Sequence, residues 1–194
     1  DRNLEMLNAL VSLGGDVDLT HEDYFPPIYY SCGNGMNIVF DRLVELGADL
    51  QCPRLLLVAC ENGHVDIVTR LIDLGVDIDY FDDECEESPL ILACRNGFIN
   101  VVKVLLERGA KPYTDEFNPL IEFVKTGNVE LISWLIEFGL EIDKMNYFGM
   151  TALRCACEEG QYEVFEKLIE LGADFRESNS SRKSKTLLMF ACVG

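Results

Sequence analysis

The sequence predicts an all-α solenoid, built from stacked helix–turn–helix units with hairpin-like loops. Two observations support this prediction. A motif of the form Leu-Gly-Ala-Asp, or a close variant, recurs along the whole chain of 194 residues, ending at positions 16, 49, 77, 111, 141 and 174. Between these motifs, apolar residues recur at helical spacing. The motif repeats after 33, 28, 34, 30 and 33 residues, and a period near 33 is typical of small helical repeat units.

The best-formed unit, residues 88–110, shows how each repeat is built. Ser88 can cap a helix, and Pro89 suits the first helical position, where no amide proton is needed. Gly97 ends this first helix because glycine adopts the left-handed conformation at little cost. A second helix follows, with an apolar stripe at positions 101, 102, 105 and 106, and it ends at Gly109. The other first helices end at Gly35, Gly63, Gly127 and Gly160.

This pattern resembles the ankyrin repeat family. Residues 60–68 read CENGHVDIV and residues 71–75 read LIDLG, which is similar to that family's signature. The resemblance extends over essentially all 194 residues and implies one ankyrin-repeat domain, which we expect to be a fragment of a longer chain. The expected full repeats are residues 19–51, 52–79, 80–113, 114–143 and 144–176, with partial repeats at 1–18 and 177–194.

The chain departs from the family pattern in two respects. The Thr-Pro-Leu-His start of the first helix lacks its histidine in every repeat, so we expect modest stability, lowest in the second full repeat. The two short steps remove residues from the loops before Leu55 and Asn118. The hairpin finger should be shortened or lost there. The resulting notch either shapes a binding groove or is tolerated loop variation.

Charge restricts the classes of partner. The chain has 16 basic and 34 acidic residues and a formal net charge of −18, a field that repels phosphate backbones and anionic membranes. No apolar run reaches the roughly 18 residues of a membrane span. We therefore expect neither nucleic-acid nor membrane binding. A protein partner, possibly with a basic patch, fits better, and the oligomeric state is left open.

The eight cysteines favour a structural role. Five of them occupy one site near the end of the first helix, normally a small buried alanine, where free cysteine behaves as a small hydrophobe. Equivalent sites in successive repeats lie roughly one repeat apart, beyond the about 7 Å that a disulfide spans. Many unpaired thiols indicate a reducing compartment, the cytoplasm or nucleus. The five are Cys32, Cys60, Cys94, Cys157 and Cys192.

No catalytic, cofactor or metal site is indicated. Zinc needs closely spaced ligands, and although Cys60 and His64 are four residues apart, the helix stop at Gly63 separates them. His64 also stands where the family itself prefers histidine. No phosphate-binding loop, nucleophile elbow or catalytic carboxylate pair can be assembled. We expect no enzyme activity and no cofactor.

The ankyrin resemblance implies that partners bind on a concave face lined by the fingers and first helices. Aromatic residues in the finger segments are the candidate contacts, since aromatics supply much of the energy of protein interfaces. The alternative is that one of each pair packs back onto its own finger. These candidates are Tyr80, Phe81, Tyr113, Phe117, Tyr147 and Phe148, with Tyr24, Phe25 and Phe175 as further finger aromatics.

Two other features are candidate contacts. The densest acidic run is either a docking site for a partner's Lys or Arg or a solvated loop. Trp134 and Val104 share one outward position on the second helices, where they form a second contact or are covered by an adjacent helix. The candidate carboxylates of the run are Asp82, Asp83, Glu84, Glu86 and Glu87.

These expectations favour a non-catalytic protein-interaction module, a scaffold or adaptor that holds a partner on its concave, acidic and aromatic face. One alternative is a regulatory or substrate-recruiting domain of a larger enzyme or channel. Another is a structural component of a large intracellular, for example cytoskeletal, assembly. Fold alone does not decide between them.

Overall fold

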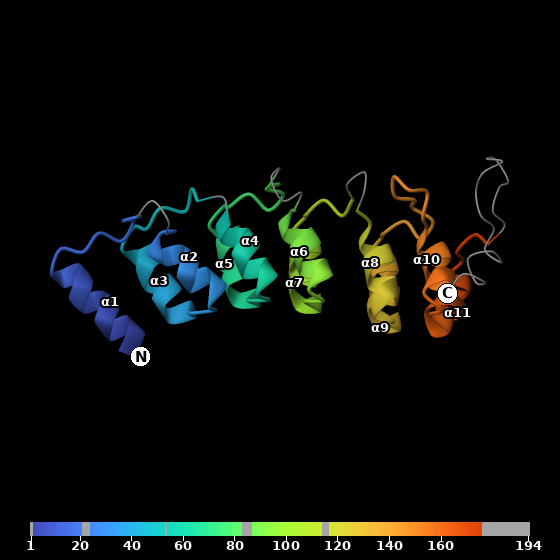
Figure 1. Cartoon of the computed structure of the whole chain (residues 1–194), viewed down its shortest axis with the longest axis horizontal. Coiled ribbons are helices and arrows are strands. Elements are labelled where there is room, and N and C mark those ends of the chain that lie inside the picture. The colour runs from blue at the N-terminus through green and yellow to red at the C-terminus, as the bar shows by residue number, and fades with distance from the viewer. Residues whose placement is uncertain (1, 21–23, 53, 83–86, 114–116, 176–194) are drawn as a thin grey trace. The chain divides into compact units, whose positions relative to one another are not determined.

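A computed structural model describes residues 2–20, 24–52, 54–82, 87–113 and 117–175. Every regular element in these ranges is an α-helix (Figure 1). One isolated antiparallel bridge, between Asp82 and Glu87, has both of its partners in the described residues. The predicted all-α class is confirmed. The expected partial repeat at 177–194, with Cys192, lies outside the described residues.

First and second helices alternate along the chain. The first helices are α2 (Pro27–Gly33), α4 (Arg54–Glu61), α6 (Pro89–Arg95), α8 (Pro119–Thr126) and α10 (Ala152–Glu158). The second helices are α1 (Arg2–Ser12), α3 (Asn37–Glu45), α5 (Val65–Asp73), α7 (Ile99–Glu107), α9 (Val129–Glu137) and α11 (Tyr162–Glu170). The chain divides into two compact units, residues 1–110 and 111–194. The extent of the repeats as one domain stays a prediction.

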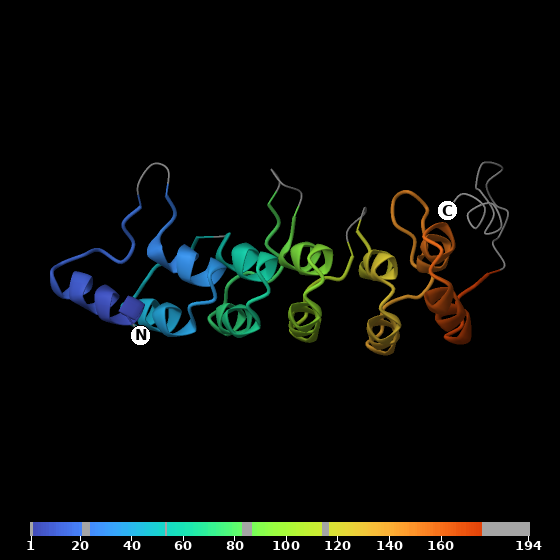
Figure 2. The same ribbon diagram turned by 60° about the horizontal axis from the view of Figure 1, so that its bottom comes forward.

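In the first unit, the first helices α2, α4 and α6 pack side by side in one layer, and α3, α5 and α7 form a second layer (Figures 1 and 2). α1 packs against α3. In the second unit, α8 packs on α10 and α9 on α11, and each first helix packs on its own second helix. The core between the layers is apolar, with Phe40, Leu56, Leu71 and Leu105 fully buried in the first unit.

Local chemistry sets the helix ends. Ser88 accepts a hydrogen bond from the Ile91 amide at 3.3 Å, as expected for a cap ahead of a proline. The side chains of Asn118 and Thr151 cap α8 and α10 in the same way. In α4, which begins at Arg54, the residues Leu55 to Cys60 are all buried.

Glycines at the turn between the two helices allow close packing of neighbouring repeats. Gly63 has φ 75°, and the Phe98 ring of the next repeat lies where a Cβ at residue 63 would stand, 2.5 Å from Phe98 Cδ1. His64 stacks against Gly35 in the same manner, and its Nε2 lies 3.0 Å from the Gly33 carbonyl oxygen. His64 therefore links two repeats.

None of the described cysteines forms a disulfide. Cys32, Cys60 and Cys94 are buried, in agreement with the alanine-like site predicted for them, whereas Cys157 of that set is half-buried. Cys155 is also buried, with its Sγ 3.8 Å from the Ile121 carbonyl oxygen.

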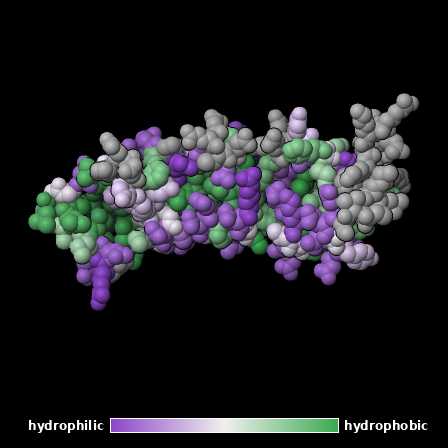
Figure 3. All heavy atoms as spheres, viewed as in Figure 1, coloured by the Kyte–Doolittle hydropathy of each residue, from purple (hydrophilic) through white to green (hydrophobic). Residues whose placement is uncertain are grey.

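In the view of Figure 3, a group of hydrophobic side chains lies at the surface over α1. Met6, Leu10 and Leu13 are exposed, and α1 has no buried residue. In the part of the chain that the structure describes, no helix is long and apolar enough to cross a membrane.

Candidate interaction surface

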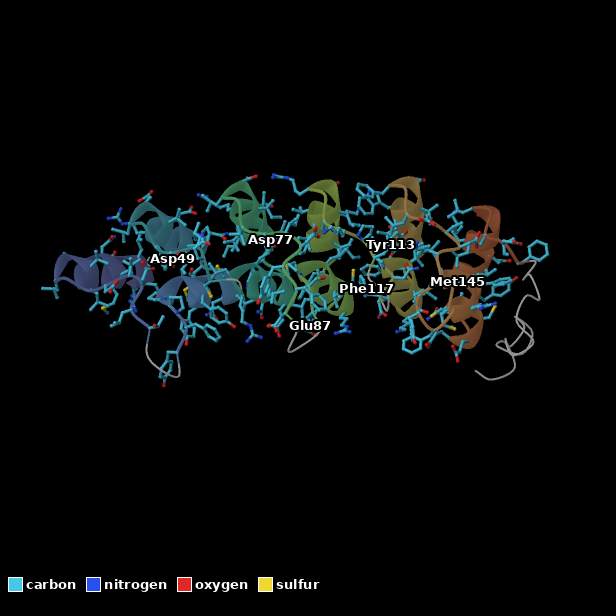
Figure 4. The ribbon with its side chains drawn as sticks, turned by 90° about the horizontal axis from the view of Figure 1, so that it is seen from above. Asp49, Asp77, Glu87, Tyr113, Phe117 and Met145 are labelled. Carbon is cyan, nitrogen blue, oxygen red and sulfur yellow. The ribbon has the colours of Figure 1, made fainter. Side chains whose placement is uncertain are left out.

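The finger of residues 144–151 presents the most exposed aromatic pair among the predicted contacts. Tyr147 and Phe148 are 76% and 72% exposed, and their rings meet edge to face with centroids 5.7 Å apart. Met145, on the same finger (labelled in Figure 4), is also exposed. The sequence predicted both aromatics as contacts, and the structure places them on one turn with solvent access.

Asn146 holds this turn in one conformation. Its Oδ1 accepts hydrogen bonds from the amides of Phe148, at 3.1 Å, and Met150, at 3.0 Å. The Asn146 amide in turn donates to the Met150 carbonyl oxygen at 3.1 Å. Arg154 from α10 donates to the Gly149 carbonyl oxygen. The aromatic pair therefore projects from an ordered base, which lowers the entropy lost when a partner binds.

Tyr113 and Phe117 have a different environment (Figure 4). Phe117 is only 7% exposed and belongs to the core of the second unit. Tyr113 is half-buried, and its hydroxyl oxygen accepts a hydrogen bond from the Glu141 amide at 2.8 Å. Burial raises the pKa of Tyr113, an effect that the amide of Glu141 opposes and its carboxylate reinforces. Lys144 Nζ lies 5.3 Å from the Tyr113 ring centroid.

The Tyr113 bond is one rung of a series that we call the finger-base ladder. In each rung, a side chain of one repeat accepts a hydrogen bond from a backbone amide of the next repeat. The acceptor residue stands four positions after the motif glycine of its own repeat, and the donor amide stands two positions after the motif glycine of the next repeat. Asp18 Oδ1 accepts from the Asp49 amide at 2.8 Å, and Asp143 Oδ1 accepts from the Asp174 amide at 3.0 Å. Tyr113 occupies the position of those aspartates, so its hydroxyl replaces their carboxylate.

The finger of the third full repeat carries both aromatic and acidic candidates. Tyr80 is half-buried, whereas the adjacent Phe81 is exposed. The Asp82 amide donates to the Glu87 carbonyl oxygen at 2.9 Å, which closes the hairpin. By contrast, residues 46–53 separate α3 from α4 without such a bridge in their described part, as the short step of 28 residues predicts.

Two carboxylates of the acidic run have basic partners within the first unit. Asp82 is buried and pairs with Arg54 at 3.2 Å. Glu87, labelled in Figure 4, pairs with Arg95 at 3.1 Å. The predicted contacts Asp83, Glu84 and Glu86 lie outside the described residues. Asp82 and Glu87 thus hold the finger against α4 and α6.

A further aromatic cluster lies at the start of α2. Phe25 stacks on Tyr29 with centroids 4.0 Å apart, and Tyr29 meets Tyr30 edge to face at 5.7 Å. Tyr24 and Tyr30 are exposed. Burial raises the pKa of Tyr29, and the nearby Arg54 opposes part of this effect. Tyr29 and Tyr30 were not among the contacts predicted from the sequence, although Tyr29 occupies the position of the family's missing histidine.

Trp134 is half-buried on α9 and stacks on Phe138, with ring centroids 5.1 Å apart. Phe138 is exposed beside it. The pair has helical i, i+4 spacing, so part of the tryptophan surface is covered by its own helix. The second-contact prediction therefore applies to a Trp134–Phe138 patch within the second unit.

Over the described ranges, no group of three or more His, Cys, Asp or Glu side chains could hold a metal ion. The arrangement consists of aromatic side chains on ordered turns, next to paired charges. Such aromatic and charged side chains are typical of surfaces that recognise another polypeptide.

The helical repeats, glycine turns and fingers define the class of a repeat protein. The chain matches the family model "Ankyrin repeats (3 copies)" over residues 1–82 and 46–116, and "Ankyrin repeats (many copies)" over residues 120–169. It therefore belongs to the ankyrin repeat family, whose domains mediate protein–protein interaction and are typically non-catalytic.

Similar solved and curated proteins agree with this family. The crystal structure of the human ASB11 ankyrin repeat domain superposes with a TM-score of 0.67 at 29% identity, covering 77% of this chain and 70% of that one. Protein phosphatase 1 regulatory subunit 27 of Mus musculus is 34% identical over 77 residues, which are 37% of this chain and 50% of the relative.

Probable E3 ubiquitin-protein ligase XBOS32 of Oryza sativa subsp. japonica is 37% identical over 62 residues. That match covers 32% of this chain and 12% of the ligase. The chain thus spans half or less of the length of these curated relatives.

Proposed function

We propose that this chain is a non-catalytic interaction module, a scaffold or adaptor that binds a partner protein on the face formed by its fingers and first helices. The observation that carries the proposal is the exposed Tyr147–Phe148 pair on a hydrogen-bonded turn. Aromatic side chains of this kind act as anchors in partner pockets, and an ordered base reduces the cost of binding.

In the first unit, the exposed Tyr24 and Phe81 and the aromatic cluster at Phe25 and Tyr30 extend the same proposal. The net charge of −18 favours a partner with a basic patch. Asp83, Glu84 and Glu86 are the proposed steering charges, because Asp82 and Glu87 already pair within the chain. The Trp134–Phe138 patch is a proposed second contact.

Two alternative functions, a regulatory or substrate-recruiting domain and a structural component of an assembly, are also proposals. One similar protein is a phosphatase regulatory subunit and another a probable ubiquitin ligase. These relatives support the alternative of a regulatory or substrate-recruiting domain within a larger enzyme. The described cysteines, which form no disulfide, support an intracellular, cytoplasmic or nuclear, setting. A role in a cytoskeletal assembly would require permanent contacts on both faces.

The test is affinity capture from source lysate with three forms of the chain. The first is the parent and the second carries Tyr147→Ser and Phe148→Ser. The third carries Tyr162→Ser as a matched control, because Tyr162 is also strongly exposed but lies at the start of α11, away from the finger. Circular dichroism should show equal helicity in all three.

We expect the parent and the Tyr162 control to retain the same partner, and the finger variant to lose it. Equal retention by all three would contradict a finger contact. A further variant, with Asp83, Glu84 and Glu86 changed to Ser, tests whether these charges only attract the partner or also contact it in the complex. If they only attract it, the variant should associate more slowly than the parent and dissociate at the same rate. Surface plasmon resonance measures both rates.

A further inference from the structure

The finger-base ladder is interrupted once within the first unit. Gln51 stands four residues after Gly47, the position that Asp18 occupies in the preceding repeat. The Asp49 amide donates to Asp18 Oδ1 at 2.8 Å, but the equivalent Asp77 amide has no acceptor among the residues that the structure describes. Asp77 is exposed, so this N–H remains available to another acceptor.

A pocket of about 250 Å³ lies at the missing rung. It is smaller than the roughly 300–1,000 Å³ of sites that enclose a drug-sized ligand, so it suits a single side chain. The pocket stands where the finger is shortest, beside Asp77 (labelled in Figure 4). Its walls include Leu50, Gln51, Leu74, Val76, Asp77 and Tyr80.

Three of the residues that line this pocket carry hydrogen-bonding groups. Besides the Asp77 amide, these are the Gln51 carboxamide and the Tyr80 hydroxyl, and neither group has a hydrogen-bond partner in the described residues. Leu50, Leu74 and Val76 supply the apolar walls. An occupant therefore needs an apolar stem and a polar end that both accepts and donates hydrogen bonds.

The charges near the pocket restrict the kinds of side chain that can bind in it. Asp77 lines the pocket with its carboxylate, whose Oδ1 accepts a hydrogen bond from the Asp79 amide at 3.0 Å. The carboxylate of Asp49 accepts a hydrogen bond from the amide of the lining residue Gln51 at 2.8 Å. A carboxylate ligand would be repelled. Lysine and arginine carry donors only and cannot accept from the Asp77 amide. A neutral carboxamide offers an acceptor oxygen to that amide and donors to Gln51, Tyr80 or the carboxylates.

We propose that this pocket, lined by Gln51, Asp77 and Tyr80, binds an asparagine or glutamine side chain of the partner protein. The bound carboxamide oxygen completes the missing rung by accepting from the Asp77 amide, as Asp18 does for Asp49. The inference rests on the proposed function, because it assumes a polypeptide partner. It assigns a specificity site separate from the Tyr147–Phe148 pair.

The test needs no partner and uses the ¹⁵N-labelled chain with small capped amino acids. N-acetyl-glutamine N-methylamide is titrated while amide chemical shifts are followed. The matched probes carry norleucine, glutamate or lysine in place of glutamine. Since all four share the same backbone amides, they isolate the side chain. We expect a saturable shift of the Asp77 amide and affinity about two- to tenfold above that of norleucine, as one or two net hydrogen bonds provide.

Two variants check the assignment. Gln51→Asp should restore the rung, slow hydrogen exchange of the Asp77 amide and abolish the glutamine response. Tyr80→Phe should weaken the response without protecting that amide. A glutamine probe no better than norleucine, a stronger response to lysine or glutamate, or undiminished binding to Gln51→Asp would each overturn the proposal. The Tyr147–Phe148 capture experiment fails or succeeds independently, so the two outcomes are distinguishable.

Discussion

At the scale of single residues, Tyr113 shows how one side chain can replace another in a repeated role. Asp18 and Asp143 accept a hydrogen bond from the next repeat's amide, and the Tyr113 hydroxyl accepts the equivalent bond from Glu141. The half-burial of Tyr113 and its raised pKa follow from this position at a repeat junction. We therefore expect Tyr113 to contribute to the stability of the fold before it contributes to partner binding.

Tyr113→Phe removes the acceptor and should lower the free energy of unfolding by about 1 kcal/mol, the net value of one hydrogen bond. Urea unfolding followed by circular dichroism measures it. Tyr147→Phe is the control, because the exposed Tyr147 hydroxyl makes no hydrogen bond in the described residues and its loss should be near neutral. Equal effects of the two changes would contradict the ladder role of Tyr113.

The buried thiols predict alkaline sensitivity. Burial raises the pKa of Cys32 to about 12 and that of Cys155 to about 11. An unfolded thiol ionises near 8.5, so the folded state holds these protons more tightly. The stabilisation is complete below the unfolded pKa and is lost as the pH rises towards the folded pKa.

Between pH 8 and pH 10.5, the parent should therefore lose more stability than Cys32→Ala, by on the order of 1–2 kcal/mol. Urea unfolding at the two pH values gives the difference. Tyrosine titration is common to both proteins and cancels. If the parent and Cys32→Ala lose equal stability, the buried-thiol explanation is wrong.

At the scale of elements, the packing of one repeat on the next depends on glycines whose neighbours differ. Gly63 meets the Phe98 ring, whereas Gly75, at the end of a second helix, has φ 86° and open space around it. Both need the left-handed conformation, which costs other residues roughly 1–2 kcal/mol. Only Gly63 also lacks room for a methyl group.

Gly63→Ala should therefore destabilise the chain by a further 1–3 kcal/mol or so beyond Gly75→Ala, the range expected for overpacking. Thermal unfolding of the two variants provides the comparison. The double variant Gly63→Ala, Phe98→Ala should lose less stability than the sum of the losses of the two single variants, because the smaller side chain at position 98 removes the clash. Indistinguishable single variants would show that the Phe98 ring moves aside freely.

The sequence predicted the elements well because each has a local signal. Ser88-Pro89 and Gly97 set the bounds of α6, and the observed helix is Pro89–Arg95. The short step predicted the shortened finger before Leu55. The sequence could not show that Asp82 pairs with Arg54, since that contact joins residues of different repeats.

The candidate contacts were harder to predict than the helices. Tyr113 and Tyr147 both lie in finger segments. Tyr113 is half-buried and its hydroxyl accepts a hydrogen bond, whereas Tyr147 is exposed. Phe117 belongs to the core. Composition identifies an aromatic finger, but exposure depends on which side chain faces the neighbouring repeat.

At the scale of the whole molecule, the charge of −18 should act on stability as well as on partner choice. Salt at about 150 mM reduces the screening length from about 30 Å at 10 mM to about 8 Å. The melting temperature should therefore rise with NaCl over this range, measured by differential scanning calorimetry. A fall would mean that ion pairs between repeats, such as Arg70 with Asp41 at 2.9 Å, outweigh the general repulsion.

Site-specific photocrosslinking tests the central claim, binding through the finger face, most directly. Benzoylphenylalanine replaces Phe148 in one form of the chain and Phe138 in another, since the two phenylalanines are exposed on the finger and on the Trp134–Phe138 patch respectively. After irradiation in source lysate, adducts are identified by mass spectrometry. The account predicts a specific adduct from position 148. An adduct from position 138 with none from position 148 would contradict it.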